Sequence, residues 1–281
     1  MKLPFHVNLE GKVAVVTGGS GVLGKTICHA LAKSGAHVVV LARDMEKIES
    51  LVDEMKADGL LASGYSVDVL NKERLKEVHD EIVSEVGRCD ILINGAGGNH
   101  PDATTSDEFY EKVENEDVKT FFDLDDGAID HLFKVNYLGT LLPTQVFATD
   151  MIEKDDAVII NISSMNAFKP LTKIPAYSGA KAAISNFTEW LAVYFSKVNI
   201  RVNAIAPGFF LTEQNKGLLI EGDGEYSERA NKIISQTPMS RFGEPEELIG
   251  TLLWLVDHRA SSFVNGIVVP VDGGFSAYSG V

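Results

Sequence analysis

Residues 13–24 have the sequence VAVVTGGSGVLG, and this stretch decides the fold. Val13–Thr17 is apolar almost throughout, which is typical of a strand buried on both faces of a parallel sheet. The glycine-rich turn after it lets the backbone bend tightly, and Lys25–Lys33 then has apolar residues at helical spacing. The N-terminus of such a helix offers unpaired N–H groups to a pyrophosphate, although a plain structural turn is an alternative. We expect contacts with a dinucleotide from Gly18, Ser20, Gly21, Val22 and Leu23.

The alternation of short apolar runs and helical patterns continues through the chain. The further predicted strands are His37–Leu41, Ala62–Val67, Ile91–Asn94, Val158–Ile162, Ile200–Ile205 and Val264–Val271. The further predicted helices are Met45–Asp58, Lys72–Val86, Ile129–Met151, Tyr177–Tyr194 and Glu244–Val256. Repeated strand–helix units predict an α/β fold, a doubly wound parallel sheet with helices on both faces. Since no linker or internal repeat divides the chain, we expect a single Rossmann-type domain over residues 1–281.

Two long connections interrupt this alternation. Residues 98–126, here called the acidic insertion, carry ten acidic residues and two lysines. Residues 208–231 form a second irregular stretch. Both follow the carboxyl ends of strands, where open α/β sheets bind ligands, and connections this long are often functional. We expect residues 208–231 to form a substrate lid. Residues 106–126 are expected to form a solvated helical flap without a metal site, because their carboxylates lack a tight ligand cluster.

Charge and composition exclude several classes of partner. The 281 residues are 45% hydrophobic and 23% charged, with a formal net charge of −15. Nucleic acids and anionic membranes attract clustered Lys and Arg, so neither is an expected partner. No run of eighteen apolar residues and no apolar leader is present, so we expect a cytoplasmic protein. Cys28 and Cys89 lack metal-ligand spacing and are expected to be buried free thiols.

The ends of the next three predicted strands suggest further cofactor contacts. An NAD site usually has an acidic residue at the end of the second strand, where it accepts a hydrogen bond from the ribose 2′-hydroxyl. Ala42 stands at this position and Arg43 follows, and a guanidinium can pair with a 2′-phosphate. The sequence therefore favours NADP, while Asp44 keeps NAD open. At the same edge of the sheet we expect contacts from Asp68, Val69, Asn94, Ala96 and Gly97.

The pentapeptide YSGAK, residues 177–181, is the most informative motif for the chemistry. Tyr177 and Lys181 lie four residues apart on one helix face. A phenol has a pKa near 10, and lowering it by about three units requires roughly 4 kcal/mol, which an ammonium and an oxidised nicotinamide together can supply. Ser164 follows a strand end, where its hydroxyl could hold a substrate oxygen or cap a helix. Asn136 could bind a helix carbonyl, or a water that links Lys181 to solvent.

Together these motifs resemble the short-chain dehydrogenase/reductase family over residues 9–275. The shared motifs are TGGSGVLG, NGAG, VNYLG, NISS, YSGAK, PG followed by a threonine, PMSRFGEPEEL and VNGIVVPVDGGF. The resemblance implies that Tyr177 is the general acid/base, and that Lys181 binds the nicotinamide ribose and lowers the pKa of the tyrosine. It implies that Ser164 orients the substrate and that Asn136 completes a proton relay. It also implies contacts with the nicotinamide end from Pro207, Gly208 and Thr212.

The resemblance carries one departure and one expectation about assembly. The family turn usually has a glycine where Val22 stands, and a valine narrows the room beside the phosphates. Members of the family usually form tetramers through helix pairs and the C-terminal strand, so a homotetramer is expected here. The candidate contact segments are Ile129–Met151, Tyr177–Tyr194 and Ile267–Tyr278.

Within the family, the GGSGVLG turn, the loop from Gly98 and SSMNAFKPLTKIPAYSGAK resemble the D-mannonate oxidoreductase (fructuronate reductase) branch, near the gluconate 5-dehydrogenases. This implies a small sugar-acid substrate, with D-fructuronate and D-mannonate interconverted by hydride transfer. Asn99 and His100 follow NGAG and could bind sugar hydroxyls, while Lys169 and Lys173 could balance a carboxylate or be surface charges. The alternatives are a reductase of gluconate, 5-ketogluconate or another carbonyl compound, and a nucleotide-binding protein that has lost catalysis.

Overall fold

The computed structural model describes residues 7–112, 117–212, 216–222 and 225–280, and these contain a seven-stranded, entirely parallel sheet in the order β3-β2-β1-β4-β5-β6-β7. The strands are β1 (Val13–Thr17), β2 (His37–Ala42), β3 (Ala62–Ser66), β4 (Ile91–Asn94), β5 (Val158–Ile162), β6 (Arg201–Pro207) and β7 (Val268–Val271). The order reverses beside β1, which is where a doubly wound sheet opens a crevice for a ligand. The predicted fold is confirmed.

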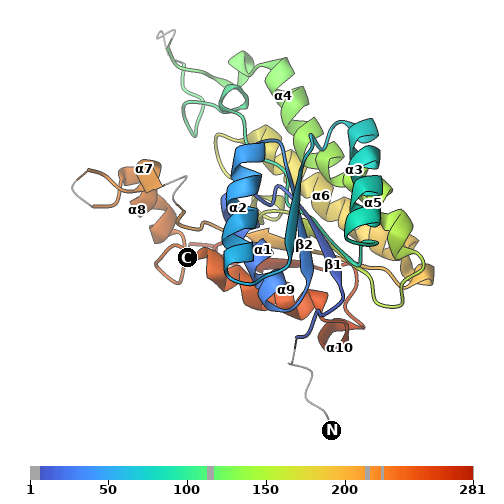
Figure 1. The fold of residues 1–281 in the computed structure, drawn as a ribbon. Coiled ribbons are helices and arrows are strands. Elements are labelled where there is room, and N and C mark those ends of the chain that lie inside the picture. The colour runs from blue at the N-terminus through green and yellow to red at the C-terminus, as the bar shows by residue number, and fades with distance from the viewer. Residues whose placement is uncertain (1–6, 113–116, 213–215, 223–224, 281) are drawn as a thin grey trace.

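Helices cover both faces of the sheet (Figure 1). One face packs against α1 (Val22–Lys33), α2 (Met45–Ala57) and α9 (Ile249–Val256). The other packs against α3 (Lys72–Glu85), α5 (Gly139–Met151) and α6 (Pro175–Tyr194). The remaining helices are α4 (Asp126–Phe133), α7 (Lys216–Leu219), α8 (Glu228–Ser235) and α10 (His258–Ser261). Strands β1, β2, β4 and β5 are buried nearly throughout because both faces are covered, which explains their continuous apolar sequences.

Some predicted elements differ from those in the structure. The helix predicted over Ile129–Met151 is divided by a π-helical turn at Lys134–Leu138. The last strand begins at Val268 rather than Val264, because a turn through Gly266 at φ +82° precedes it. The helical flap is wrong: the described residues between 106 and 125 contain only a short 3-10 turn, Phe121–Asp123, and α4 starts after them.

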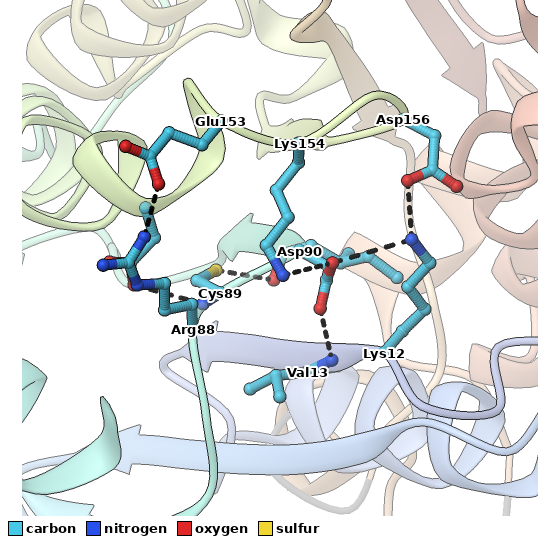
Figure 2. A network of polar contacts seen from close by, with 10 residues as sticks. Lys12, Val13, Arg88, Cys89, Asp90, Glu153, Lys154 and Asp156 are labelled. Atoms are coloured by element: carbon cyan, nitrogen blue, oxygen red, sulfur yellow. Dashed lines mark hydrogen bonds and ion pairs between the residues drawn. The ribbon is translucent and has the colours of Figure 1, made fainter. Parts of the chain in front are cut away.

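The amino edge of the sheet, opposite the carboxyl ends, is held by a network around Asp90 (Figure 2). Asp90 is only 4% exposed, and its carboxylate accepts a hydrogen bond from the Val13 amide at 3.0 Å. Lys154 lies 3.0 Å from the carboxylate and Lys12 lies 3.6 Å away, while Lys12 also pairs with Asp156. The two ammonium groups offset the desolvation of the buried carboxylate. This network therefore stabilises the fold on the side away from the candidate site.

A second ion pair on this side involves His79 of α3 and Asp150 of α5. His79 Nε2 lies 3.1 Å from Asp150 Oδ1, and Asp150 Oδ2 accepts a hydrogen bond from the Cys89 amide at 3.1 Å. The hydrogen bond to Asp150 raises the pKa of His79, against the effect of burial. Burial alone would raise the pKa of Asp150, but the hydrogen bonds from His79 and the Cys89 amide hold it below its usual value.

We expect this pair to make the free energy of unfolding depend on pH. Because the folded pKa of His79 is raised, its contribution is complete below about pH 6.5 and is lost as pH rises through the folded value. The contribution of Asp150, whose pKa is lowered, is lost only in acid. Urea unfolding at about pH 6 and about pH 9 should show a decrease that His79→Gln lacks, on the order of 1 kcal/mol. An equal decrease in both proteins would contradict the expectation.

Two further expectations concern burial and membranes. Both cysteines are buried and free, as expected, and burial raises the pKa of each thiol. In the described part of the chain, no helix is both long enough and apolar enough to cross a membrane.

Candidate active site

The glycine-rich turn joins β1 to α1 and leaves little room for side chains. Gly18 has φ +68°, and a Cβ on it would lie 2.9 Å from the backbone of Gly95 and Ala96. A Cβ on Gly24 would lie 2.3 Å from the Gly18 carbonyl oxygen. The N-cap of α1 is Gly21, and no side chain caps the helix. The first N–H groups of α1 are thus open to an anion, which fits a dinucleotide pyrophosphate.

Thr17, which the sequence reasoning did not assign, joins this turn to the next strand end. Its hydroxyl accepts hydrogen bonds from the Gly95 amide at 3.1 Å and the Ala96 amide at 3.3 Å. The sequence signal that could have identified Thr17 is that it is the polar residue at the end of an otherwise apolar strand. These bonds place the backbone of the NGAG motif beside the glycine turn. The side chain of Asn94 instead points into the core, where it donates to Thr144 and Asn161 at 2.9 Å.

Residues at the ends of β2 and β3 line the same edge of the sheet. Arg43 is exposed, and its guanidinium has no ion-pair partner among the described residues. Asp44 instead caps α2 by accepting from the Lys47 amide at 3.2 Å, and it also pairs with the Lys47 side chain. Asp68 accepts from the Leu70 amide at 2.9 Å. The carboxylates of Asp44 and Asp68 thus have local structural roles, whereas the guanidinium of Arg43 is available. The side chain of Val69 is buried.

Asn136 lies in the π-helical turn and is fully buried. Its Nδ2 donates to the Leu132 carbonyl at 2.9 Å, and this bond to a helix carbonyl is one of the two expected alternatives. The same amide group also binds the backbone of Gly98, donating to its carbonyl at 2.8 Å and accepting from its N–H at 3.3 Å. A Cβ on Gly97 would lie 2.5 Å from Asn136 Oδ1. Asn136 thereby fixes the first residue of the acidic insertion.

Tyr177 and Lys181 lie together at the start of α6, as their spacing predicts. Lys181 Nζ is 5.6 Å from the centre of the Tyr177 ring and donates to the Ile162 carbonyl at 2.9 Å. Burial lowers the pKa of Lys181 to about 8. Desolvation of its hydroxyl raises the pKa of Tyr177, and a hydrogen bond with Ser164 acts in the opposite direction. Lys181 is not among the causes of this shift, so the lowering of the tyrosine pKa that was expected from the lysine is not seen here.

Ser164 contacts the tyrosine and also caps a short 3-10 turn, Met165–Ala167. Its hydroxyl accepts from the Asn166 amide at 3.3 Å, which is the capping role that was the structural alternative. The same side chain interacts with the Tyr177 hydroxyl. Ser164, Tyr177 and Lys181 thus converge at the carboxyl edge of the sheet, and Gly97 lies beside Lys181 Nζ, since a Cβ there would be 3.3 Å away.

The end of β6 and the segment after it lie at this edge of the sheet. Pro207 is buried, and Gly208 lies so near Asp272 that a Cβ would be 2.6 Å from its Cα. The Thr212 carbonyl accepts from the Lys216 amide at the start of α7. Residues 213–215 and 223–224 of the expected lid lie outside the described residues. A cavity of about 180 Å³ lies next to this segment, between Phe209, Arg241 and Asp272, rather than at Tyr177.

Besides Ser164, four residues proposed for the substrate have internal partners in this structure. Asn99 Nδ2 donates to Thr104 Oγ1 at 3.1 Å, and His100 Nδ1 accepts from the Asp102 amide at 3.1 Å. Lys169 Nζ donates to the Tyr278 carbonyl of the C-terminal tail. Lys173 Nζ donates to the Ser106 carbonyl at 2.7 Å. The Nδ1 hydrogen bond leaves the Nε2 position of neutral His100 as a donor.

Known proteins resemble the whole chain. The profile of the short chain dehydrogenase family matches residues 12–220. An uncharacterized oxidoreductase of Haemophilus influenzae is 57% identical over 281 residues, 100% of this chain and 99% of the relative. A crystal structure of a Haemophilus influenzae protein with bound NAD, provisionally described as a D-mannonate oxidoreductase, has a TM-score of 0.95 at 58% identity and 98% coverage of both chains.

A more distant structure has the same fold. A gluconate 5-dehydrogenase from Burkholderia cenocepacia, in complex with NADP and tartrate, has a TM-score of 0.84 at 28% identity. The match covers 98% of this chain and 99% of that chain. The family profile spans most of the chain, and the convergence of Ser164, Tyr177 and Lys181 beside a glycine-rich turn agrees with it. The chain belongs to the short-chain dehydrogenase family of oxidoreductases.

Proposed function

We propose that the protein is an NAD(P)-dependent dehydrogenase that interconverts D-fructuronate and D-mannonate. The observation that carries the proposal is the grouping of Ser164, Tyr177 and Lys181 at the sheet edge that also carries the glycine turn. The similar Haemophilus influenzae structure described as a D-mannonate oxidoreductase supports the substrate.

The side chains at this edge divide the chemistry among them. Tyr177 donates a proton to the substrate oxygen in reduction and takes it back in oxidation. Ser164 holds the same oxygen through its hydroxyl. Lys181 binds the nicotinamide ribose and adds positive charge beside the phenol. Asn136 holds the backbone at Leu132 and Gly98, along which a proton relay reaches solvent. When bound, the nicotinamide supplies or accepts the hydride.

A sugar acid suits the groups around the mouth of the site. Asn99 and the Nε2 of His100 offer donors to hydroxyl oxygens, and Lys169 offers a cation to a carboxylate if it leaves its carbonyl partner. Residues 208–231 would cover the substrate. They lead into α8, which is joined to the acidic insertion by the Lys232–Glu108 ion pair. The chain itself is strongly acidic, so these few cations matter for attracting an anion.

The test is a spectrophotometric assay of the purified protein with NADH or NADPH and a panel of ketoacids. Oxidation of the coenzyme with D-fructuronate, at a kcat/KM well above that with 5-ketogluconate, is the expected result. A preference for 5-ketogluconate would move the assignment to the gluconate 5-dehydrogenase reaction, which the Burkholderia cenocepacia structure favours. Binding of coenzyme without turnover of any carbonyl compound would contradict both assignments.

The coenzyme preference rests on Arg43, whose exposed guanidinium favours NADP, although the similar Haemophilus influenzae structure binds NAD. We expect Arg43→Ala to lower kcat/KM for NADPH about ten- to a hundredfold, the value of a hydrogen bond to a charged group, and to change kcat/KM for NADH little. Steady-state kinetics with both coenzymes measures the ratio. A parallel decrease for both coenzymes would show that Arg43 does not select the 2′-phosphate.

We also propose a homotetramer, assembled partly through the outer face of α6. Trp190 and Tyr194 are 56% and 65% exposed, and their rings stack with centroids 4.8 Å apart. Large stacked aromatic rings on an exposed helix face are typical of a protein interface. Sedimentation equilibrium should give about four times the mass of one chain, 30.5 kDa. The monomer mass at all concentrations would contradict this.

A further inference from the structure

Lys173 has an unusual backbone conformation four residues before Tyr177. Its φ is +71°, in the left-handed region that favours glycine. A side chain in this region persists only where the surroundings hold it, and such residues gather at functional sites. Here the acidic insertion binds both the backbone and the side chain of Lys173. The Lys173 carbonyl accepts a hydrogen bond from the Thr105 amide at 2.9 Å, and Lys173 Nζ donates one to the Ser106 carbonyl at 2.7 Å.

The same part of the insertion packs against the catalytic helix. Ala103 is fully buried in a small apolar cluster with Ala176 and Ala180 of α6. The ring of Tyr177 packs against this cluster, and so does α4 through Leu132. The insertion therefore contacts α6 through apolar packing beside the tyrosine, and it contacts Lys173, two residues before the helix, through two hydrogen bonds.

The start of α6 has little local support of its own. Its N-cap is Ile174, which makes no side-chain capping bond, so Pro175 at the first helical position is its main local support, and Tyr177 lies in the first turn. Uncapped first turns are held weakly by the helix itself. The position of the phenol thus depends on the segment before the helix, and that segment is tied to the insertion at Lys173.

We propose that Lys173 is a positioning residue, which clamps the acidic insertion to the start of α6 and so holds Tyr177 in line with Ser164. The proposal rests on the proposed catalytic role of Tyr177 but not on the identity of the substrate. It differs from a role in binding a substrate carboxylate, because a clamp affects every substrate equally. The insertion is thereby part of the catalytic framework rather than a solvated flap.

The experiment compares Lys173→Ala with a matched control. Asn199 also has positive φ, +59°, but lies on the surface between α6 and β6, near the amino edge of the sheet. Asn199→Ala likewise leaves an alanine at positive φ, but away from the site. We expect Lys173→Ala to lower kcat about ten- to a hundredfold, as small misplacements of reacting groups do, with KM changed less than about threefold. Asn199→Ala should keep the wild-type kcat, and Lys173→Arg should recover most of it.

Three kinetic outcomes would overturn the proposal. The first is unchanged kcat in Lys173→Ala, and the second is an equal loss of kcat in Asn199→Ala. The third is a rise in KM confined to acidic substrates, with a neutral ketone unaffected, because this would make Lys173 a carboxylate ligand. If Lys173→Ala folds poorly, Lys173→Gly removes the same side chain and suits the positive φ, so its kcat decides.

A second readout separates this proposal from the proposed function. Amide hydrogen exchange of residues 103–106 and 174–178 reports the clamp without any turnover. In Lys173→Gly we expect exchange there about tenfold faster than in the wild type, and no change around Asn199. If the wild-type protein turned over no carbonyl compound, the proposed function would fail while exchange still tested the clamp. Unchanged exchange in Lys173→Gly would overturn the clamp whatever the activity.

Discussion

Replacement of Tyr177 by Phe is expected to lower kcat about a thousandfold while leaving the Kd for the coenzyme within about twofold. The phenylalanine keeps the ring that packs beside Ala176 and Ala180, so the fold and the coenzyme site should be unaffected. It removes the hydroxyl that contacts Ser164 and that we propose exchanges the proton. Stopped-flow absorbance at saturating coenzyme measures the chemical step, and quenching of protein fluorescence measures coenzyme binding.

A matched control for this variant is Tyr65→Phe. The Tyr65 hydroxyl donates to Glu85 at 2.6 Å on the surface of the sheet, so its removal tests the general loss of a hydroxyl bond. The control should keep wild-type kcat. Turnover by Tyr177→Phe within tenfold of the wild type would show that another group, or water, carries the proton, and the assignment of Tyr177 would be wrong.

The sequence predicted the parts of the site whose geometry is local. Tyr177 and Lys181 share a helix face because they are four residues apart, and the glycine turn joins consecutive elements. The position of Ser164 beside the phenol follows from the parallel sheet, which brings the carboxyl ends of its strands to one edge. These placements need only periodicity and topology, and sequence patterns contain both.

The sequence could not predict what depends on contacts between distant segments. Residues 106–126 were expected to form a helical flap, but the insertion is tied to the segment before α6 by hydrogen bonds from the Thr105 amide to the Lys173 carbonyl and from Lys173 Nζ to the Ser106 carbonyl. The positive φ of Lys173 could not be predicted from the sequence either, because lysine has no preference for positive φ. The side-chain contacts of Asn94, which donates to Thr144 and Asn161, likewise join segments that lie far apart in the sequence.

The second large effect is expected for Gly24→Ala, because the glycine turn tolerates no extra atom at this position. The added Cβ would lie 2.3 Å from the Gly18 carbonyl and 2.8 Å from the Gly19 carbonyl, and backbone must move to relieve both contacts. Displacing two N–H donors from the pyrophosphate costs about 1.5 kcal/mol each, so the Kd for NAD(H) and NADP(H) should rise about a hundredfold. Isothermal titration with each coenzyme measures this.

Gly250→Ala separates a local clash from a general effect of replacing glycine. Gly250 lies on the exposed side of α9 with nothing within 4 Å of its added Cβ, so alanine there should stabilise the protein by about 0.5–1 kcal/mol and leave the Kd unchanged. Gly24→Ala should instead lower the melting temperature as well as the affinity, since the strained turn is also the junction of β1 and α1. If Gly24→Ala bound both coenzymes with wild-type affinity, the pyrophosphate would have to be held elsewhere, because the N-terminus of α1 cannot keep its place when its third residue is forced away from Gly18.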